Sequence, residues 1–403
     1  MYLRTSARLI ALAFAFSASA RAADLSFEGY ADFRLVVPGS ETGWLYGGLG
    51  KLRFGGTQPD PNFRFAEAVG QATLSLNDDL HFVAVGRLEP ETRSGIDMLE
   101  GYATYRPDFD DWNAAFKVGA FFPPFSLENT DIGWTSPYTL TPSAINSWVG
   151  DELRTIGGEV RVGRQTSFGT FALTASLFCC NDPAGVLIAD RGWTLDDRPT
   201  GLFEEVREPD ATLQLFHADH PDRTPLFLEI DHNVGWYAGA TWSMAGIGKA
   251  AIYHYDNEAN PAAHIDDYFG WRTHFWSFGW ESHFGAVSFL AQGLTGDTAI
   301  RPFPGFTATT TFKSAYFLAS YDLDDWRFAA RAETFQTRAK ALPGLLDEDG
   351  DAFTLCASWT PKDWLRLSSE VIAITSRRGE RVIVGLRPTQ SDTQFQLSIR
   401  ILN

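Results

Sequence analysis

The sequence predicts an all-β protein, a transmembrane antiparallel β-barrel of about sixteen strands. Apolar and polar side chains alternate in segments of about ten residues, and the connections between segments are short and long in turn. The composition agrees, since 32 Phe, 13 Trp, 12 Tyr and 36 Gly suit strands and turns better than helices. After residue 20, no stretch approaches the roughly 18 consecutive apolar residues of a spanning helix.

The last segment shows the alternation most clearly. Its apolar residues are Phe395, Leu397, Ile399 and Ile401, and its polar residues are Gln394, Gln396, Ser398 and Arg400. Because successive side chains of a strand point to opposite faces, this segment has one apolar and one polar face. The same habit recurs over 156–163, 170–177 and 365–371, which we predict to be two-faced strands.

The connections determine the architecture. Short ones lie at 77–79, 107–111, 165–168, 245–248, 283–285, 322–325 and 361–363, which gives seven hairpins. One further strand at each end brings the total to about sixteen. Long connections lie at 37–65, 89–97, 122–151, 181–231, 259–269, 297–308, 339–351 and 376–389. Strict alternation of short turns with long loops is typical of a barrel in the bacterial outer membrane.

Aromatic residues follow five of the short turns: Trp112, Phe168, Phe284, Trp326 and Trp364. We expect their rings to lie at one membrane interface, with the turn in water and the strand in lipid. The alternative is a soluble exported β protein in which these rings belong to the core.

Residues 1–23 have the pattern of a secretory signal peptide, with Arg4 and Arg8 ahead of an apolar run from Leu9 to Ala18. The predicted barrel therefore occupies residues 24–403. Three cysteines do not make a disulfide scaffold in a chain of this length. We interpret Cys179, Cys180 and Cys356 as small buried hydrophobic residues.

The polar strand faces predict a channel, because a barrel in lipid turns its apolar face outward and sixteen strands leave a lumen too wide for side chains to fill. The candidate pore-lining residues are Lys117, Glu159, Arg161, Arg327, Arg331, Glu333, Arg366 and Glu370. The net charge of −17 argues against a nucleic-acid partner.

The third long connection, 122–151, is rich in Pro and Trp, which suggests a folded segment. The blocks from Lys117 to Arg154 and from Gly47 to Gly55 resemble outer-membrane porins related to the phosphate-selective porins O and P. The resemblance implies a barrel that is often trimeric and whose third loop folds into the lumen as a constriction. The candidate constriction residues are Glu128, Asp131, Trp134 and Trp148. Phosphate-selective members place Lys and Arg there, whereas this segment has two acids and no Lys or Arg between residues 122 and 150.

The predicted function is an outer-membrane porin for passive diffusion of small polar solutes or ions, assembled as a homotrimer in outer-membrane lipid. No enzyme, cofactor or metal site is predicted, since Ser, His and Asp are too scattered to nominate a catalytic triad. His217, Asp219, His220 and Asp222 favour a solvated polar loop, and the acids at 347–351 do not match a twelve-residue calcium loop. The alternatives are an outer-membrane barrel enzyme and a soluble exported β protein.

Overall fold

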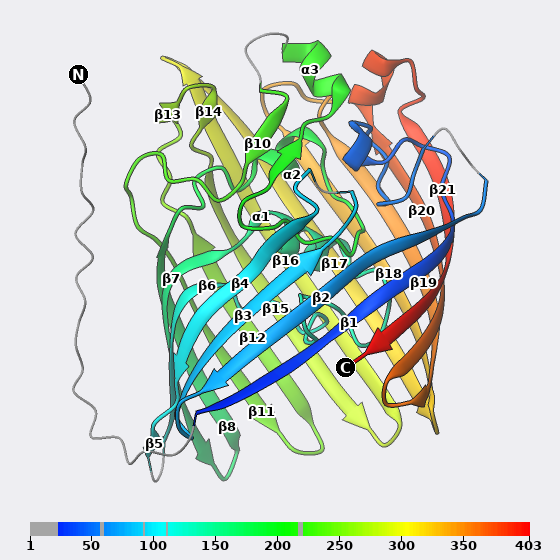
Figure 1. Cartoon of the computed structure of the whole chain (residues 1–403). Helices are drawn as coiled ribbons and strands as arrows, with labels where there is room; N and C mark the ends of the chain where they lie inside the picture. The colour runs from blue at the N-terminus through cyan, green and yellow to red at the C-terminus, as the bar shows by residue number, and fades with distance from the viewer. Residues whose placement is uncertain (1–22, 57–59, 92, 110–111, 217–220) are drawn as a thin grey trace.

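The computed structural model describes residues 23–56, 60–91, 93–109, 112–216 and 221–403. Within that part of the chain, one antiparallel sheet of seventeen strands closes on itself (Figure 1). One of them, β5 (Asp108–Phe109), is a two-residue strand beside the start of β6, and the other sixteen make the barrel. The predicted signal peptide lies outside the described residues up to residue 22, and β1 begins at Asp24.

The barrel strands are β1 (Asp24–Val37), β2 (Asn62–Ser75), β3 (Leu80–Leu88), β4 (Ile96–Tyr105), β6 (Trp112–Phe121), β7 (Thr155–Thr166), β8 (Gly169–Cys179), β11 (Gly235–Met244), β12 (Gly248–Asp256), β15 (Arg272–Phe284), β16 (Val287–Phe303), β17 (Phe306–Leu323), β18 (Trp326–Ala339), β19 (Glu348–Lys362), β20 (Leu365–Arg378) and β21 (Thr389–Leu402). Each pairs with the next along the chain, and β1 pairs with β21, with Tyr30 opposite Leu402 and Val37 opposite Phe395. This last ladder leaves the barrel without a free edge.

The remaining elements are short and lie in the long connections. They are η1 (Trp44–Tyr46), α1 (Ala144–Glu152), α2 (Val186–Asp190), β9 (Glu205–Arg207), α3 (Asp210–Phe216), β10 (Arg223–Pro225), β13 (His264–Ile265), β14 (Tyr268–Phe269) and η3 (Gly379–Val384). None of the described helices has the length and apolar character needed to cross a membrane. We call the end of the barrel where the strands meet in short connections the tight-turn end, and the other the long-loop end (Figure 1).

The predicted hairpins are confirmed, because consecutive strands flank all seven expected tight turns; residues 110–111 of one turn lie outside the described part. The expected long connection at 297–308 is wrong. There β16 and β17 continue as paired strands, with Ile300 opposite Ala308, and turn tightly at Pro304 and Gly305. The threonines at 307 and 309–311 favour an extended chain, and Gly305 adopts the left-handed conformation that the turn requires (φ 83°).

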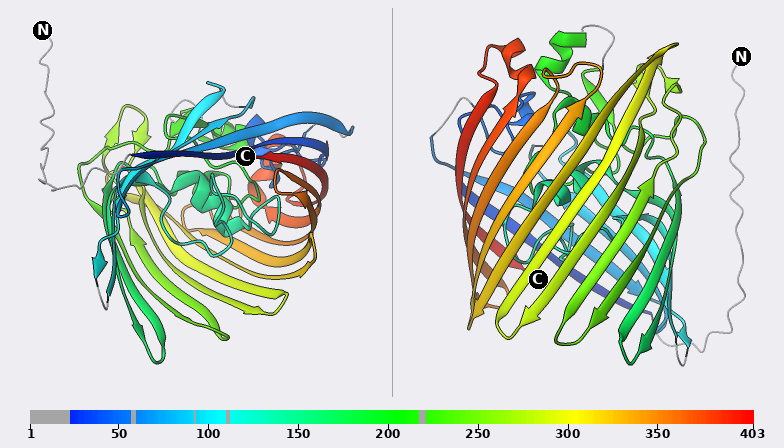
Figure 2. Two further views of the ribbon diagram at one scale, coloured as in Figure 1. Left: turned by 60° about the horizontal axis from the view of Figure 1, so that its bottom comes forward. Right: turned by 180° about the vertical axis from the view of Figure 1, so that it is seen from behind.

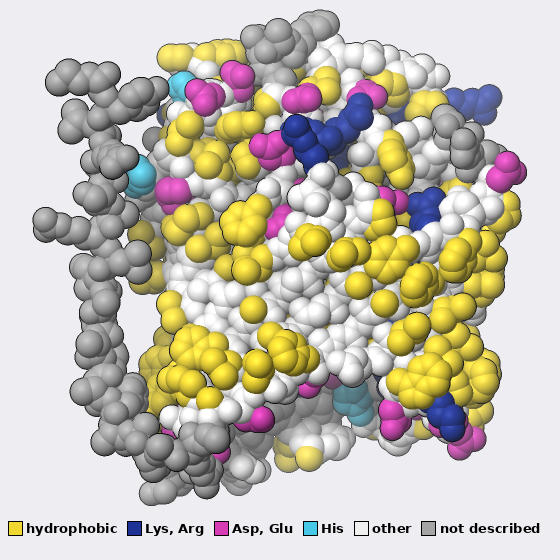
Figure 3. All heavy atoms as spheres, in the orientation of Figure 1, with side chains coloured by type: hydrophobic (Ala, Val, Ile, Leu, Met, Phe, Trp, Pro, Cys, Tyr) yellow, Lys and Arg dark blue, Asp and Glu magenta, His cyan; other side chains and the backbone are white. Residues whose placement is uncertain are grey.

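The outer face of the barrel is apolar and exposed. Leu173 on β8 and Val118 on β6 point outward with 68% and 62% of their surface exposed, and apolar side chains spread over the wall seen in Figure 3. The five aromatic residues predicted to form a girdle, Trp112, Phe168, Phe284, Trp326 and Trp364, are all exposed at the tight-turn end. A wall of this kind is stable in lipid and not in water, which excludes the soluble exported β protein.

The cysteines differ in part from the prediction. Cys356 is buried, as expected, but Cys179 and Cys180 form a disulfide between adjacent residues at the end of β8. The interpretation of these two residues as small buried hydrophobic residues is therefore wrong, because they are disulfide-bonded and only half-buried. The chain leaves the strand at Cys180, which has a positive φ of 65°, and this sharp turn brings the two sulfur atoms together.

The apolar wall gives a first prediction. Leu173→Arg places a charge outward near the middle of β8, and we expect the free energy of unfolding in a lipid bilayer to fall by about 2–4 kcal/mol. The matched control is Leu323→Arg, at the tight-turn end of β17, where the expected cost is about 0–1 kcal/mol. Urea titration of both variants in bilayers measures the difference, and equal costs would contradict a lipid-facing wall.

Candidate functional site in the barrel lumen

The connection between β6 and β7 contacts the inward face of the opposite barrel wall. The backbone N–H groups of Leu140 and Ala144 donate to the carboxylates of Glu370 on β20 and Glu333 on β18, each at 2.7 Å. Gln292 on β16 donates to the carbonyl of Phe125 at 2.8 Å. The view into the tight-turn end shows the ribbon of α1 within the ring of strands (Figure 2). Three alternate strands, β16, β18 and β20, therefore hold the segment through inward-pointing side chains.

The central contact joins Arg331 of β18 to Glu128 of this segment. Both side chains are fully buried, and one guanidinium N–H donates to Glu128 Oε1 at 2.6 Å. Arg331 Nε also donates to Glu333 at 2.7 Å, and other N–H groups donate to the carbonyls of Thr141 and Pro142. The second oxygen of Glu128 accepts from the backbone N–H of Ser143 at 2.9 Å. A buried charge is tolerated only with such a complete set of partners.

Helix α1 packs into this contact region, and all of its residues are buried. Ser143 caps its N-terminus by accepting from the Asn146 N–H. Trp148 lies against Phe275 and Phe312 of the wall, with ring centroids 5.3 and 5.1 Å apart. Apolar and aromatic contacts therefore fill the lumen on the side of β15 and β17.

Trp134 is held between the loop and the helix. Its ring stacks on Phe122 at a centroid distance of 4.4 Å, and its Nε1 donates to the carbonyl of Asn146 at 2.8 Å. Gly150 of α1 faces this ring, where a Cβ atom would come within 2.8 Å of it. A glycine is therefore required at this position for the tryptophan to pack.

The carboxyl end of α1 carries two buried acids, Asp151 and Glu152. Burial raises the pKa of Glu152 to about 7, against the opposing effect of the Gly185 and Ile188 N–H groups that donate to it. Burial, and next the neighbouring Asp196, raise the pKa of Asp151 well above its usual value. Protonation near neutral pH is therefore linked to the packing of α1 against α2.

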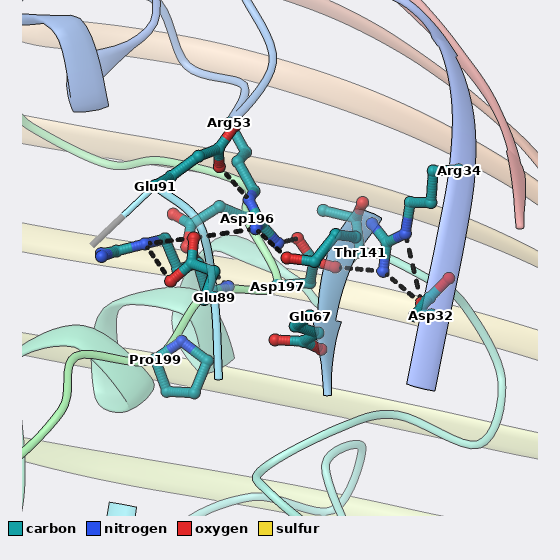
Figure 4. A network of polar contacts seen from close by, with 12 residues as sticks. Asp32, Arg34, Arg53, Glu67, Glu89, Glu91, Thr141, Asp196, Asp197 and Pro199 are labelled. Carbon is teal, nitrogen blue, oxygen red and sulfur yellow. Dashed lines mark hydrogen bonds and ion pairs between the residues drawn. The ribbon is translucent and has the colours of Figure 1, made fainter. Parts of the chain in front are cut away.

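Charged residues fill the side of the lumen next to β1 and β3. Asp197 lies between two arginines, with one oxygen 3.0 Å from Arg53 and the other 2.5 Å from Arg34 on β1 (Figure 4). Although burial alone would raise it, Arg34 and then Arg53 hold the pKa of Asp197 well below its usual range. Glu89, which follows β3, accepts from Arg53 at 2.9 Å and from Arg198 at 2.8 Å. Through Arg53, Asp197 and Arg198, this network ties the connections that follow β1 and β8 to the barrel wall.

The predicted pore-lining residues all lie on inward faces of their strands, but they differ in exposure, and Lys117 and Glu159 are half-buried. Arg331, Glu333 and Glu370 are buried beneath the loops. Arg161 is exposed, and Arg327 and Arg366 keep 33% and 25% of their side chains exposed. Lys117 lies over the rings of Tyr102 and Phe121, and Glu159 accepts from the hydroxyl of Tyr237.

The four predicted constriction residues also separate. Glu128, Trp134 and Trp148 pack in the interior, as described above, whereas Asp131 is exposed, 3.9 Å from Arg366. Sequence reasoning missed Arg53, Glu89, Asp197 and Arg198, because they lie in loops where no strand periodicity marks them. The high density of charge in these loops was the available signal.

The acids at 347–351 do not assemble into a cation site. Asp347 accepts from the N–H groups of Ala339 and Gly344, Glu348 pairs with Lys51, and Asp349 pairs with Arg338. Of the residues considered as metal ligands on the loop after α3, 217–220 lie outside the described part.

A closed barrel of sixteen antiparallel strands with an apolar wall and long connections inside it has the porin fold. The structure is similar to in-vitro folded OmpT, an outer membrane protein of Vibrio cholerae, at 11% identity, over 96% of this chain and 99% of that one, with a TM-score of 0.56. It is also similar to the outer membrane channel DcaP of Acinetobacter baumannii (12% identity, 94% and 97% covered, TM-score 0.56). A third similar structure is the anion-selective porin from Comamonas acidovorans, at 12% identity, over 94% of this chain and 100% of that one, with a TM-score of 0.55. No family model and no curated protein sequence matches the chain.

The buried pair gives a second prediction. Glu128→Gln leaves Arg331 without one of its two carboxylates, so we expect a loss of about 3–5 kcal/mol in unfolding free energy. Asp349→Asn, which breaks an ion pair whose side chains are 40% and 49% exposed, serves as control and costs less than about 1 kcal/mol. A loss no greater than the control's would show that the pair does not hold the segment.

The acid at the end of α1 gives a third prediction. Its pKa is about 7 in the folded protein against an ordinary 4.5, so the folded state binds the proton more tightly. The stabilisation is therefore fully present below pH 4.5 and is lost as the pH rises through 7, by about 3 kcal/mol. Glu152→Gln removes this loss, and unfolding measured from pH 4 to 8 in both proteins isolates it. Parallel pH profiles would contradict the assignment.

Proposed function

We propose that the protein is a porin of the bacterial outer membrane that lets small polar solutes or ions diffuse passively. The observation that carries this proposal is the closed sixteen-stranded barrel with an apolar outer wall and a charged inner face. In lipid, such a wall separates two aqueous compartments, and the polar face provides the route between them. The solved barrels of similar fold support the same conclusion.

The route is narrow. The inward-facing side chains of β16 to β21 are buried over much of their length, for example Gln292, Tyr316 and Gln396, because the long connections lie against them. The segment 122–154 serves as the constriction in this proposal, with Glu128, Trp134 and Trp148 anchoring it and Asp131 facing water. We therefore expect a unit conductance well below that of a sixteen-stranded barrel with an open lumen.

Selectivity in this proposal depends on the water-exposed charges rather than on the buried ones. Glu128 and Arg331 neutralise each other, whereas Asp131, Arg161, Arg327 and Arg366 are accessible to a passing ion. A low-dielectric wall focuses the field of such charges on the lumen. The segment lacks the Lys and Arg of phosphate-selective porins, so phosphate selectivity is not part of the proposal. Assembly as a homotrimer is part of it, supported by the sequence resemblance to porins.

Among the described residues, one histidine lies within hydrogen-bond distance of both a serine hydroxyl and a carboxylate, as the enzyme alternative requires. On the β15–β16 hairpin, His283 Nδ1 lies 2.7 Å from Ser288 Oγ, and its Nε2 lies 2.7 Å from Glu281. Ser288 is only 9% exposed, which leaves little space for a substrate carbonyl to approach its hydroxyl. We propose that these residues stabilise the tight-turn end and that the protein is not an enzyme. The test compares the rate of ester hydrolysis by the unaltered protein with that by Ser288→Ala. Equal rates support the proposal, and a lower rate in the variant contradicts it.

The fourth prediction concerns ion preference. Arg366→Ala removes an accessible positive charge and shifts the reversal potential under a salt gradient towards the equilibrium potential of the cation. Asp131→Asn removes a negative charge and shifts the reversal potential towards the equilibrium potential of the anion. Arg377→Ala is the matched control, because Arg377 points outward from the same strand as Arg366 and leaves the potential unchanged. The measurement uses single channels in planar lipid bilayers.

Folding is checked separately by the heat-dependent shift in gel mobility that intact barrels show. Stepwise conductance from folded protein supports the porin. Silence from a correctly folded barrel would overturn the proposal.

A further inference from the structure

The long-loop end of the barrel contains an apolar cavity of about 570 Å³ that the diffusion of polar solutes does not explain. Its walls come from four parts of the chain that surround the barrel mouth: the tip of the β16–β17 hairpin, the β12–β15 connection with β14, the β18–β19 connection, and the end of α3 with β10 (Figure 1). Helix α2 supplies the floor through Val186 and Ala189.

The floor is packed, so the cavity is separate from the lumen below. Val186 and Ala189 belong to a buried apolar cluster with Leu187, Leu226 and Trp271, against which Ile300 packs. The walls are also fixed by backbone hydrogen bonds: Trp271 N–H donates to the carbonyl of Asp182 at 2.7 Å, and Arg301 N–H to that of Pro261 at 2.6 Å. The cavity is therefore preformed and needs no rearrangement to receive a ligand.

The lining is aromatic and aliphatic. Rings from Tyr268, Phe269, Trp271, Phe303 and Phe306 surround the space. Phe303 and Phe306 stack on each other at a centroid distance of 4.9 Å and are 57% and 37% exposed at the hairpin tip, where a ligand from outside would arrive. The charged residues of the described lining are the acids Asp190 and Asp267, with no Lys or Arg, so the lining disfavours an anion. Most of the other lining residues are apolar, which favours a ligand with a large apolar surface.

The volume of the cavity agrees with that of pockets that bind small molecules. Pockets that bind such ligands measure about 300–1,000 Å³ and are mostly apolar with a few polar groups at the edge. Thr309 and Thr310 of β17 provide hydroxyl groups of this kind. An aromatic ligand in the cavity gains additional stabilisation from stacked and edge-to-face contacts with the rings of the lining.

We propose that this cavity is a binding site for a neutral aromatic small molecule of one to three rings at the external mouth of the barrel. The site stands apart from the proposed porin activity, because it lies above the packed α2 floor and its occupancy is measured without conductance.

The test uses benzophenone, a neutral two-ring photoprobe, on the full-length barrel in lipid bilayers, with naphthalene as competitor. After irradiation, mass spectrometry locates the labelled peptides. We expect label on the peptides that carry Tyr268 and the β16–β17 tip, and we expect excess naphthalene to remove it. Label only on lipid-facing peptides, or label that naphthalene does not displace, overturns the proposal.

Two variants that fill the cavity sharpen the test. Ala308→Trp on the inward face of β17 and Ala341→Trp in the β18–β19 connection each place an indole in the space and reduce the competed label at least about tenfold. If Ala308→Trp does not fold, the labelling of Ala341→Trp alone tests the site. Ala315→Trp, on the outward face of β17, is the matched control and keeps the label. Full labelling of both folded cavity variants would contradict the site.

Discussion

The ladder between β1 and β21 is the constraint on which the rest of the structure depends. In hydrocarbon an unpaired strand edge leaves a row of backbone groups without hydrogen bonds, so only a closed sheet is stable there. Eight opposing residue pairs from Tyr30–Leu402 to Val37–Phe395 bring the two ends of the described barrel together. Once the sheet is closed, the period-two alternation places one side chain in lipid and the next inside. The apolar wall and the charged interior are consequences of the same geometry.

Closure of the sheet also creates a wide lumen, in which parts of the long connections pack. A sixteen-stranded ring encloses more space than its own side chains can fill, and described parts of three long connections, with buried residues such as Arg53, Trp148 and Trp193, pack inside it. Their backbone groups and charges are then removed from water, so each needs a partner. Glu128 with Arg331, and Asp197 between Arg34 and Arg53, meet that need through ion pairs, and α1 meets it through its helical backbone hydrogen bonds and the Ser143 cap. The interior combines a polar side near β1 with an aromatic side near β15.

Strand positions were predictable because a strand in a membrane wall must repeat every second residue. Thus the alternation of Phe395, Leu397 and Ile399 with polar residues predicts β21 from the sequence alone. The inward orientation of residues such as Arg331 and Glu370 follows from the alternation in their own strands. The same local logic failed at 297–308, where a Gly-containing turn made paired strands resemble a loop, and at Cys179 and Cys180, whose bonding depends on a sharp turn after β8. Both errors concern connections, where no periodicity constrains the chain.

The sequence by itself determined the class of fold, a strand number of about sixteen and the side of the wall to which the residues of clearly alternating strands point, because alternation is a local property of an extended chain. Tertiary structure alone decided which residues share the interior. Glu128 and Arg331 are 203 positions apart, and Arg34 and Asp197 come from the first strand and a distant loop. Their pairing follows from curvature and closure of the sheet, which bring opposite walls within reach of one loop. No pattern in neighbouring residues records a contact across a barrel.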